Sequence, residues 1–378
     1  MSPIELDRDA RTARYRDEAV SLLPKEFQLL DTFQRHLGRT LSREQLLDAV
    51  WPLESPTDRT VDDHVYRLRK KLSAWRDAYV IRTVRGAGYR LEAKAAPAGR
   101  PHPLAADPAH AERMRGLIDA NLLYGRGDAL LALAKQSDVL GFELDEPMRL
   151  LVPFLEGRFR PLVHGDAPFG TRVYYLLHLY HLMKPEASRP FVEAALRRRM
   201  MPAMLHDEVE RHNMSFMLMD WGDFDAAEAM LEAAWANAIA APEPNLMPYL
   251  ANQRLELPMK LGDWTGAGER LAEIERLMEK YPFQREEGLF LVLRGVLQYR
   301  ERPRDGAASI DLGIATLRRS RFVPHLLDGL QTALRYAARE GWPEVTDRYA
   351  TERERLIADT EIAGLLPYIE AELRKHLT

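Results

Sequence analysis

Basic side chains are concentrated near the N-terminus, where residues 59–90 contain nine lysines and arginines against three acidic residues. Such side chains bind phosphate oxygens, and an arginine guanidinium can also donate two hydrogen bonds to one guanine edge. Residues 1–94 hold 18 basic and 15 acidic residues, whereas the remainder holds 35 and 42. A basic patch on a chain of net charge −4 indicates a surface for a polyanion. On charge alone, a solvated charged face is an equal interpretation.

The element that must position these cations has helical spacing. Its apolar residues fall four, three and four apart, at Val61, Val65, Leu68 and Leu72. Its other side carries basic residues, at Arg67, Lys70 and Lys71, with Arg69 beside them. This pattern predicts a helix from about Thr60 to Trp75 with an apolar back and a basic front. A helix that enters the major groove of DNA needs both faces.

Smaller elements are predicted around this helix. Pro24 suits the first turn of a helix that Gly38 ends, and Ser42 with Gln45 resembles a capping box that opens another helix. Residues 79–84 and 89–91 are predicted strands joined by a tight turn, and short antiparallel strands are predicted within 3–23. The N-terminal part is therefore expected to be an α+β domain.

Five sequence segments together resemble the effector domain of the OmpR/PhoB family. They follow in order and spacing over residues 4–92, as LPKEFQLL (23–30), LSREQL (41–46), RTVD (59–62), LRKKL (68–72) and TVRGAGYRL (83–91). The resemblance implies a winged helix-turn-helix that binds double-stranded DNA, with Thr60 to Leu72 as the recognition helix. It covers only the first quarter of the chain.

The same resemblance implies roles for individual residues. Base edges would be read by Arg67, Asp63 and Tyr66. Phosphates would be held by Arg59, Thr60, His64, Arg69, Lys70 and Thr83. The wing residue Arg85 would enter the minor groove. RNA polymerase would contact the loop that contains Pro52, Leu53, Glu54 and Ser55. Two such heads on tandem half-sites imply a homodimer.

Two kinds of departure from the family stand out. Asp63 occupies a position where the family often has an apolar residue, and Tyr66 one where a basic residue is common, so the operator sequence is not implied. A response regulator also carries a receiver domain ahead of this segment. Because the resembling segment begins at about residue 4, we expect no receiver and no control by phosphorylation.

The rest of the chain is predicted to be helical. An alanine- and proline-rich stretch, 95–109, is expected to link domain 1–94 to domain 110–378. Helix breaks recur about every 36–42 residues, at Gly222-Asp223-Phe224, Gly262-Asp263-Trp264, Arg304-Asp305-Gly306 and Gly341-Trp342-Pro343. This period is typical of a helical solenoid, and the segment resembles a tetratricopeptide-repeat array that senses a signal or mediates oligomerisation. The whole chain is thus expected to be multidomain, an α+β winged helix followed by an all-α repeat.

Composition argues against several function classes. The chain has no cysteine, which excludes disulfides, thiolate metal sites and cysteine nucleophiles and fits a cytoplasmic protein. No apolar run approaches the roughly 20 residues of a membrane span. The pairs His178/His181 and His206/His212 lack a zinc-protease pattern and are expected to be structural. We therefore expect no catalytic site, metal or cofactor.

Three hypotheses follow. The leading one is a one-component, sequence-specific transcription regulator whose repeat domain binds a peptide, small ligand or protein, or dimerises. The second is a protein-interaction scaffold whose winged helix binds protein, for which Asp62 and Asp63 give slight support. The third, an enzyme, lacks any catalytic constellation. The tyrosines 174, 175 and 180 are expected in the core rather than in a groove.

Overall fold

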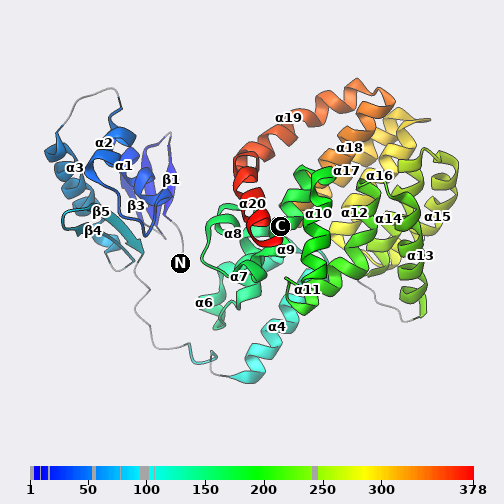
Figure 1. Cartoon of the computed structure of the whole chain (residues 1–378), viewed down its shortest axis with the longest axis horizontal. Coiled ribbons are helices and arrows are strands. Elements are labelled where there is room, and N and C mark those ends of the chain that lie inside the picture. Colours follow the sequence, from blue (N-terminus) through cyan, green and yellow to red (C-terminus); the bar gives the residue numbers. More distant parts are fainter. Residues whose placement is uncertain are drawn as a thin grey trace. The chain divides into compact units, whose positions relative to one another are not determined.

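The computed structural model describes residues 4–8, 10–15, 18–52, 57–76, 78–93, 102–105, 107–240 and 246–378. The chain divides into two compact units, Met1–His102 and Pro103–Thr378. The first combines strands with helices, and the second is helical throughout its described part (Figure 1). No described helix is long and apolar enough to cross a membrane.

The first unit contains a three-stranded antiparallel sheet, three helices and a hairpin. Its elements are β1 (Glu5–Asp7), β2 (Thr12–Tyr15), β3 (Glu18–Ser21), α1 (Pro24–Arg35), α2 (Arg43–Val50), α3 (Asp58–Lys71), the 3₁₀ turn Leu72–Trp75, β4 (Tyr79–Val84) and β5 (Gly88–Ala93). Within this unit, the three-stranded sheet lies on one side, and α3 with the β4–β5 hairpin lies on the other (Figure 1). A sheet and three helices around one core confirm the α+β expectation.

Local chemistry explains where these helices begin. Pro24 is the first residue of α1, where its missing N–H costs nothing. The capping box of α2 is formed in both directions: Gln45 N–H donates to Ser42 Oγ at 3.1 Å, and Ser42 N–H donates to Gln45 Oε1 at 2.9 Å. The predicted helix from Thr60 onward begins at Asp58, and its last turn tightens into the 3₁₀ turn.

The second unit contains seventeen α-helices in its described part. They are α4 (Pro108–Leu123), α5 (Gly127–Lys135), α6 (Ser137–Leu140), α7 (Glu146–Leu155), α8 (Arg160–His164), α9 (Phe169–Met183), α10 (Pro185–Arg197), α11 (Ala203–Glu208), α12 (Met214–Asp220), α13 (Phe224–Ala240), α14 (Leu246–Leu261), α15 (Trp264–Lys280), α16 (Gln284–Tyr299), α17 (Pro303–Ser320), α18 (Val323–Glu340), α19 (Pro343–Asp359) and α20 (Ile362–Leu377). A π-helical turn, Val209–Asn213, joins α11 to α12.

Three of the four predicted breaks separate helices. Gly222, Gly262 and Gly341 have φ of +77°, +82° and +73°, which L-residues rarely adopt, and each follows the end of a helix. The fourth predicted break, at 304–306, is displaced by a few residues: α16 ends at Tyr299 and α17 begins at Pro303, so residues 304–306 lie in the first turn of α17. Gly306 is instead a packing residue: a Cβ there would lie 2.4 Å from the Tyr299 backbone.

The expected linker also ends early. Most of 95–109 lies outside the described residues, but Pro108 already belongs to α4. The Asp107 side chain accepts from the Ala109 N–H at 2.9 Å, so the helix begins with an aspartate cap followed by proline. Aspartate and proline are both common at the start of a helix, so proline content alone cannot distinguish a linker from a helix start.

The last helix packs back onto an early part of the second unit. Helix α20 contacts α8, α9 and α10, and its Leu365, Ile369 and Leu373 are buried in their shared core (Figure 1). Three ion pairs tie the same surfaces, Arg160–Glu361 at 3.0 Å, Lys184–Glu370 at 3.3 Å and Arg172–Glu372 at 3.4 Å. An open solenoid leaves its two ends apart, whereas these helices close on one another. The tetratricopeptide-like repeat stays a prediction.

Candidate nucleic-acid interface

Helix α3 presents one exposed polar face opposite its buried apolar one. Val61, Val65 and Leu68 are buried without measurable exposure. The exposed residues recur at helical spacing on the other side, at Arg59, Asp63, Tyr66, Arg67 and Lys70. Tyr66 is 68% exposed, an unusual position for a large aromatic side chain. The structure thus brings all three predicted base-reading residues, Asp63, Tyr66 and Arg67, onto one surface.

Two of the predicted phosphate-binding residues contact each other. Arg69 donates from Nη2 to Thr83 Oγ1 and from Nε to the Ile81 carbonyl, both at 2.9 Å. Its guanidinium also lies 5.6 Å from the Tyr89 ring centroid. Arg69 therefore fixes α3 to strand β4, so that the recognition helix and the wing keep one geometry. Arg69 and Thr83 both remain exposed and can still reach a phosphate.

His64 and Thr60 lie half-buried on the flank of α3. His64 Nδ1 lies 2.8 Å from the Thr60 carbonyl oxygen, and its ring meets the edge of the Trp51 ring at 5.0 Å. Trp51 is buried, and Lys25 Nζ lies 5.6 Å from its ring centroid. These contacts orient the His64 ring beside the exposed face of the helix.

Asp62 has a structural role that the sequence did not reveal. Its Oδ1 accepts from Arg43 Nε at 2.8 Å and from the Tyr89 hydroxyl at 2.6 Å. The Tyr89 hydrogen bond and the Arg43 cation together hold the pKa of Asp62 below its usual range. Asp62 thus joins α3 to the start of α2 and to β5. The Asp62 carboxylate is therefore engaged by these two partners, whereas no hydrogen bond or ion pair from the described residues reaches Asp63.

The C-terminal end of α3 is held by a buried carboxylate. Glu26 is 1% exposed, and its Oε2 accepts from Lys71 Nζ at 2.7 Å and from the Leu23 N–H at 2.9 Å. Burial disfavours its charged form, but the Lys71 ammonium and the backbone N–H outweigh burial, so the pKa of Glu26 is lowered. Lys71 also donates to the Ser21 carbonyl at 3.0 Å. It therefore positions α3 and is not free for DNA.

The wing depends on glycine at a close approach. Strands β4 and β5 pair from Tyr79↔Ala93 to Val84↔Gly88, and Arg85 is exposed in the turn between them. Gly88 has a φ of +128°, and a Cβ there would lie 2.0 Å from the Leu41 carbonyl oxygen. The next residue, Tyr89, exchanges two 2.9 Å backbone hydrogen bonds with Leu41. The base of the wing is thus bound to the segment that opens α2.

The predicted polymerase-contact loop is only partly described. Pro52 is exposed in a turn directly after α2. Leu53, Glu54 and Ser55 lie outside the described residues. Nothing in the described part of the chain tests their role.

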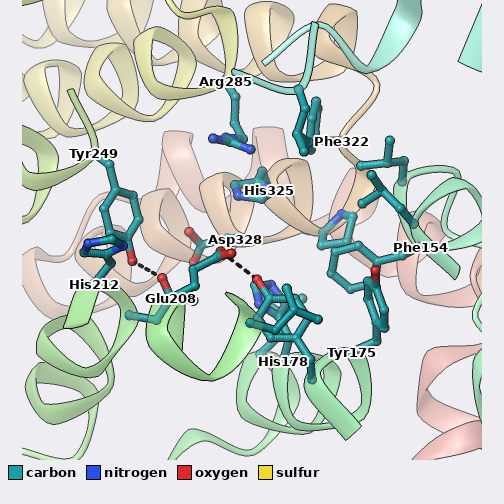
Figure 2. Close-up of a pocket in the computed structure, with 18 of the residues that line it drawn as sticks. Phe154, Tyr175, His178, Glu208, His212, Tyr249, Arg285, Phe322, His325 and Asp328 are labelled. Carbon is teal, nitrogen blue, oxygen red and sulfur yellow. Dashed lines mark hydrogen bonds between the residues drawn. The ribbon is translucent and has the colours of Figure 1, made fainter. Parts of the chain in front are cut away.

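The second unit contains a large cavity that the sequence did not predict. Its volume is about 2110 Å³, and it is lined chiefly by faces of α4, α7, α9, α14, α16 and α18 together with the turn at 208–213. Figure 2 shows Tyr249, Glu208, Asp328, His178 and Arg285 gathered around it. Tyr175 and Tyr180 are buried in the core as expected, and Tyr174 packs against the same core; Tyr174 and Tyr175 also line the cavity.

A signal for this cavity was present in the sequence. Polar residues follow one face of α14 at helical spacing, at Asn252, Gln253, Glu256 and Lys260, one turn after Tyr249. The same holds for α18, at His325, Asp328, Gln331, Thr332 and Arg335. A buried helix with a polar row requires partners or a ligand for that row. Of the expected structural histidines, His181 bonds Ser188 Oγ at 2.8 Å and Asp220 at 3.0 Å, and no metal cluster occurs among the described residues.

Comparisons with known proteins agree with the winged-helix interpretation of the first unit. Residues 17–91 match the family described as "Transcriptional regulatory protein, C terminal". The chain is 52% identical over 90 residues to the phosphate regulon transcriptional regulatory protein PhoB of Rhizobium meliloti, and 43% identical over 94 residues to the transcriptional regulatory protein SrrA of Staphylococcus aureus. Each alignment covers 24% of this chain. It spans 40% of the first relative's length and 39% of the second's.

Solved structures of DNA-binding domains match about a quarter of the chain. The DNA-binding domain of Bacillus subtilis CssR is 38% identical, with coverage of 23% of this chain and 98% of that chain and a TM-score of 0.21. The DNA-binding domain of the response regulator AdeR, solved in complex with an intercistronic region, is 28% identical, with coverage of 25% and 98% and a TM-score of 0.23. From its motifs, its elements and its relatives, the N-terminal part of the chain is an OmpR/PhoB-type winged-helix DNA-binding domain.

Proposed function

We propose that this chain is a sequence-specific transcription regulator of one-component type, in which the winged helix binds DNA and the helical unit receives the input signal. The observation that carries the proposal is the exposed face of α3, with Arg59, Arg67 and Lys70 opposite a fully buried apolar back. A helix of this kind fits the major groove, and the hairpin with Arg85 at its tip fits an adjacent minor groove.

Arg67 is the residue that we assign to base reading. Its neighbours on the helix, Arg69 and Lys71, are held by hydrogen bonds within the protein, whereas Arg67 projects from the exposed face. A guanidinium that bonds a guanine edge contributes about 1–3 kcal/mol of discrimination against the wrong base. Lys70 and Arg59 flank it and would neutralise phosphates, which adds affinity without sequence information.

The helical unit supplies the proposed input. Its cavity is far larger than the small voids between packed side chains, and a lining that combines apolar walls with polar groups is a feature of ligand sites. Helical arrays also bind peptide segments, and a second copy of the chain could bind through the same unit. We propose that occupancy of the helical unit alters how two DNA-binding heads are presented, which would make the active form a homodimer.

The alternative hypothesis, a scaffold whose winged helix binds protein, is less well supported once the contacts of Asp62 are known. It depended on Asp62 and Asp63 as an acidic protein-binding patch. Because Asp62 is bonded to Arg43 and Tyr89, only Asp63 remains to offer a carboxylate on the exposed face.

Fluorescence anisotropy with selected operator DNA tests the proposal. We expect Arg67→Ala to weaken binding by about 1–3 kcal/mol and to relax specificity at one base pair. The matched control is Arg14→Ala, because Arg14 is an exposed arginine on strand β2, in the sheet on the other side of the unit (Figure 1). Lys70→Ala should weaken all sequences alike and reduce the salt dependence. Unchanged affinity and specificity in Arg67→Ala, or salt-independent binding by the unsubstituted chain, would favour the scaffold.

A further inference from the structure

The cavity of the second unit has an excess of carboxylates. Its lining contains eleven aspartates and glutamates against seven lysines and arginines. Several of these cations already have partners within the protein. Arg285 is paired with Glu286, and Lys260 Nζ lies 2.6 Å from Asp220 Oδ1. Arg335 Nη1 lies 3.4 Å from Glu256 Oε1.

Asp328 and Glu208 are among the lining carboxylates that form no ion pair with the described residues. No hydrogen bond or ion pair from the described residues reaches the Asp328 carboxylate. Glu208 accepts a hydrogen bond from the neutral Tyr174 hydroxyl at 3.0 Å, and the cation that acts on it, Arg285, is itself ion-paired with Glu286. Figure 2 shows both side chains extending into the same region of the cavity from different elements, α18 and the end of α11. The π-helical turn that follows Glu208 is a distortion often found at binding sites.

Buried acceptors without donors lie in the same lining. Asn252 is 7% exposed and donates from Nδ2 to the Glu286 carbonyl at 2.9 Å, which leaves its Oδ1 without a hydrogen bond. Glu286 is 1% exposed, and its Oε2 also lacks a donor. An unsatisfied buried acceptor costs about 1–3 kcal/mol, so such groups point to a missing donor. The amide nitrogen of Gln253, in the same lining, is a buried donor without an acceptor, so acceptors that lack a donor outnumber the reverse case among these three residues and favour a ligand that chiefly donates hydrogen bonds, such as an ammonium or a guanidinium.

The walls of the cavity suit a cation with an apolar body. The Tyr174 hydroxyl donates to Glu208. Figure 2 shows Tyr249 beside the carboxylates, with Phe154 and Phe322 on the far side of His178 and His325. Aromatic faces attract cations and bury apolar surface. The histidines add no positive charge at neutral pH: burial, with help from His181 and Arg285, lowers the pKa of His178 to about 4. Burial likewise lowers the pKa of His325.

We propose that this cavity binds the cationic group of a ligand, an alkylammonium or a guanidinium, at Asp328 and Glu208, with its apolar body against the surrounding aromatic rings. The proposal builds on the proposed function by naming the chemistry of the input. The volume of about 2110 Å³ exceeds that of ordinary small-molecule pockets. The cation therefore comes either from a free amine or from a basic side chain of a bound peptide.

Isothermal titration calorimetry on the full chain tests this. The probes are phenethylamine, its neutral counterpart 2-phenylethanol, and its anionic counterpart 3-phenylpropionate. A capped Ala-Lys-Phe-Ala peptide and its lysine-acetylated form make up the peptide arm. We expect the cationic member of each set to bind about tenfold or more tightly than its neutral or anionic counterpart. Tighter binding of the peptide would name a peptide as the source, and tighter binding of phenethylamine a free amine.

Two isosteric variants locate the cation. Asp328→Asn and Glu208→Gln should each weaken binding of the cationic probe about tenfold or more. Glu269→Gln is the matched control, because Glu269 is an exposed carboxylate on α15 outside the cavity lining. The proposal is overturned if no cationic probe binds at millimolar concentration, if the anion binds as well as the amine, or if neither variant changes the affinity.

The DNA assay separates this proposal from the proposed function. Asp328→Asn without a probe should bind operator DNA as the unsubstituted chain does. Conversely, Arg67→Ala should bind the cationic probe normally. Failure of one assay with success in the other therefore identifies which of the two proposals is wrong.

Discussion

Replacement of Asp328 by asparagine should stabilise the second unit at alkaline pH while it removes a ligand contact. Burial is the largest cause that disfavours the charged form of Asp328, and the nearby Glu256 and Asp220 carboxylates disfavour it further. The Arg335 and Lys260 cations favour the charged form but do not outweigh these effects. The net effect raises the pKa of Asp328 from 3.8 to about 7. Asparagine has nearly the same shape and carries no charge, so the variant removes this cost.

The sign follows from proton linkage. Below pH 4 the side chain is protonated in both the folded and unfolded chains, and the variant should match the unsubstituted protein. Between pH 4 and pH 7 the unfolded chain loses this proton first, so the stability of the unsubstituted protein falls as pH rises. A shift of about three pKa units corresponds to a ceiling of about 4 kcal/mol above pH 7. Water in the cavity screens the charge and reduces this figure, so we expect about 1–4 kcal/mol.

Urea denaturation followed by far-ultraviolet circular dichroism measures this difference, since the second unit holds most of the helices. The free energies of unfolding should coincide near pH 4 and diverge up to pH 8, with Asp328→Asn the more stable, while Glu269→Gln tracks the unsubstituted protein throughout. A gap that does not change with pH, or a less stable Asp328→Asn at pH 8, would refute the reasoning that the cavity disfavours this charge.

Two further predictions concern the N-terminal unit. Gly88→Ala should destabilise this unit by several kcal/mol, because the new Cβ would overlap the Leu41 carbonyl. Gly86 has open space around it, so Gly86→Ala should cost only about 1–2 kcal/mol, for its positive φ. Equal urea midpoints for the two variants would contradict this prediction. Lys71→Met should cost about 3–5 kcal/mol at pH 7 because it leaves the buried Glu26 carboxylate without its cation. The lowered pKa of Glu26 contributes stability that is present above its unfolded pKa and is lost as pH falls through its folded pKa. The difference in free energy of unfolding between Lys71→Met and the unsubstituted chain should therefore become smaller in acid. A difference that grows in acid would argue against this ion pair.

The recognition helix was predictable because its evidence is local. The spacing of Val61, Val65 and Leu68 fixes which face is buried, and it thereby assigns Arg67 to the exposed face without any tertiary information. The roles of Asp62 and Arg69 were not predictable from spacing. Both lie beside the exposed face, and only pairing with distant partners on α2, β4 and β5 shows that they position the helix.

In the second unit too, local patterns predict helix ends but not contacts between residues far apart in the sequence. Helix ends at Gly222, Gly262 and Gly341 were predicted from glycine chemistry, which acts within one turn. The packing of α20 on α9 joins residues two hundred positions apart, as in the Arg172–Glu372 pair, and no local pattern encodes it. The cavity is formed by the faces of several helices at once. It therefore could not be placed from the sequence, although the polar row on α14 was visible there.

The measurement that tests the central claim most directly is selection of genomic DNA fragments by the purified full chain, in parallel with an Arg67→Ala/Arg85→Ala double variant. The account predicts that the unsubstituted chain enriches a repeated half-site and that the double variant loses this enrichment while its fold is unchanged by circular dichroism. Enrichment of the same sites by both proteins would show that α3 and the wing do not read the DNA. Absence of enrichment by the unsubstituted chain at moderate salt, with and without a cationic probe, would contradict the regulator account as a whole.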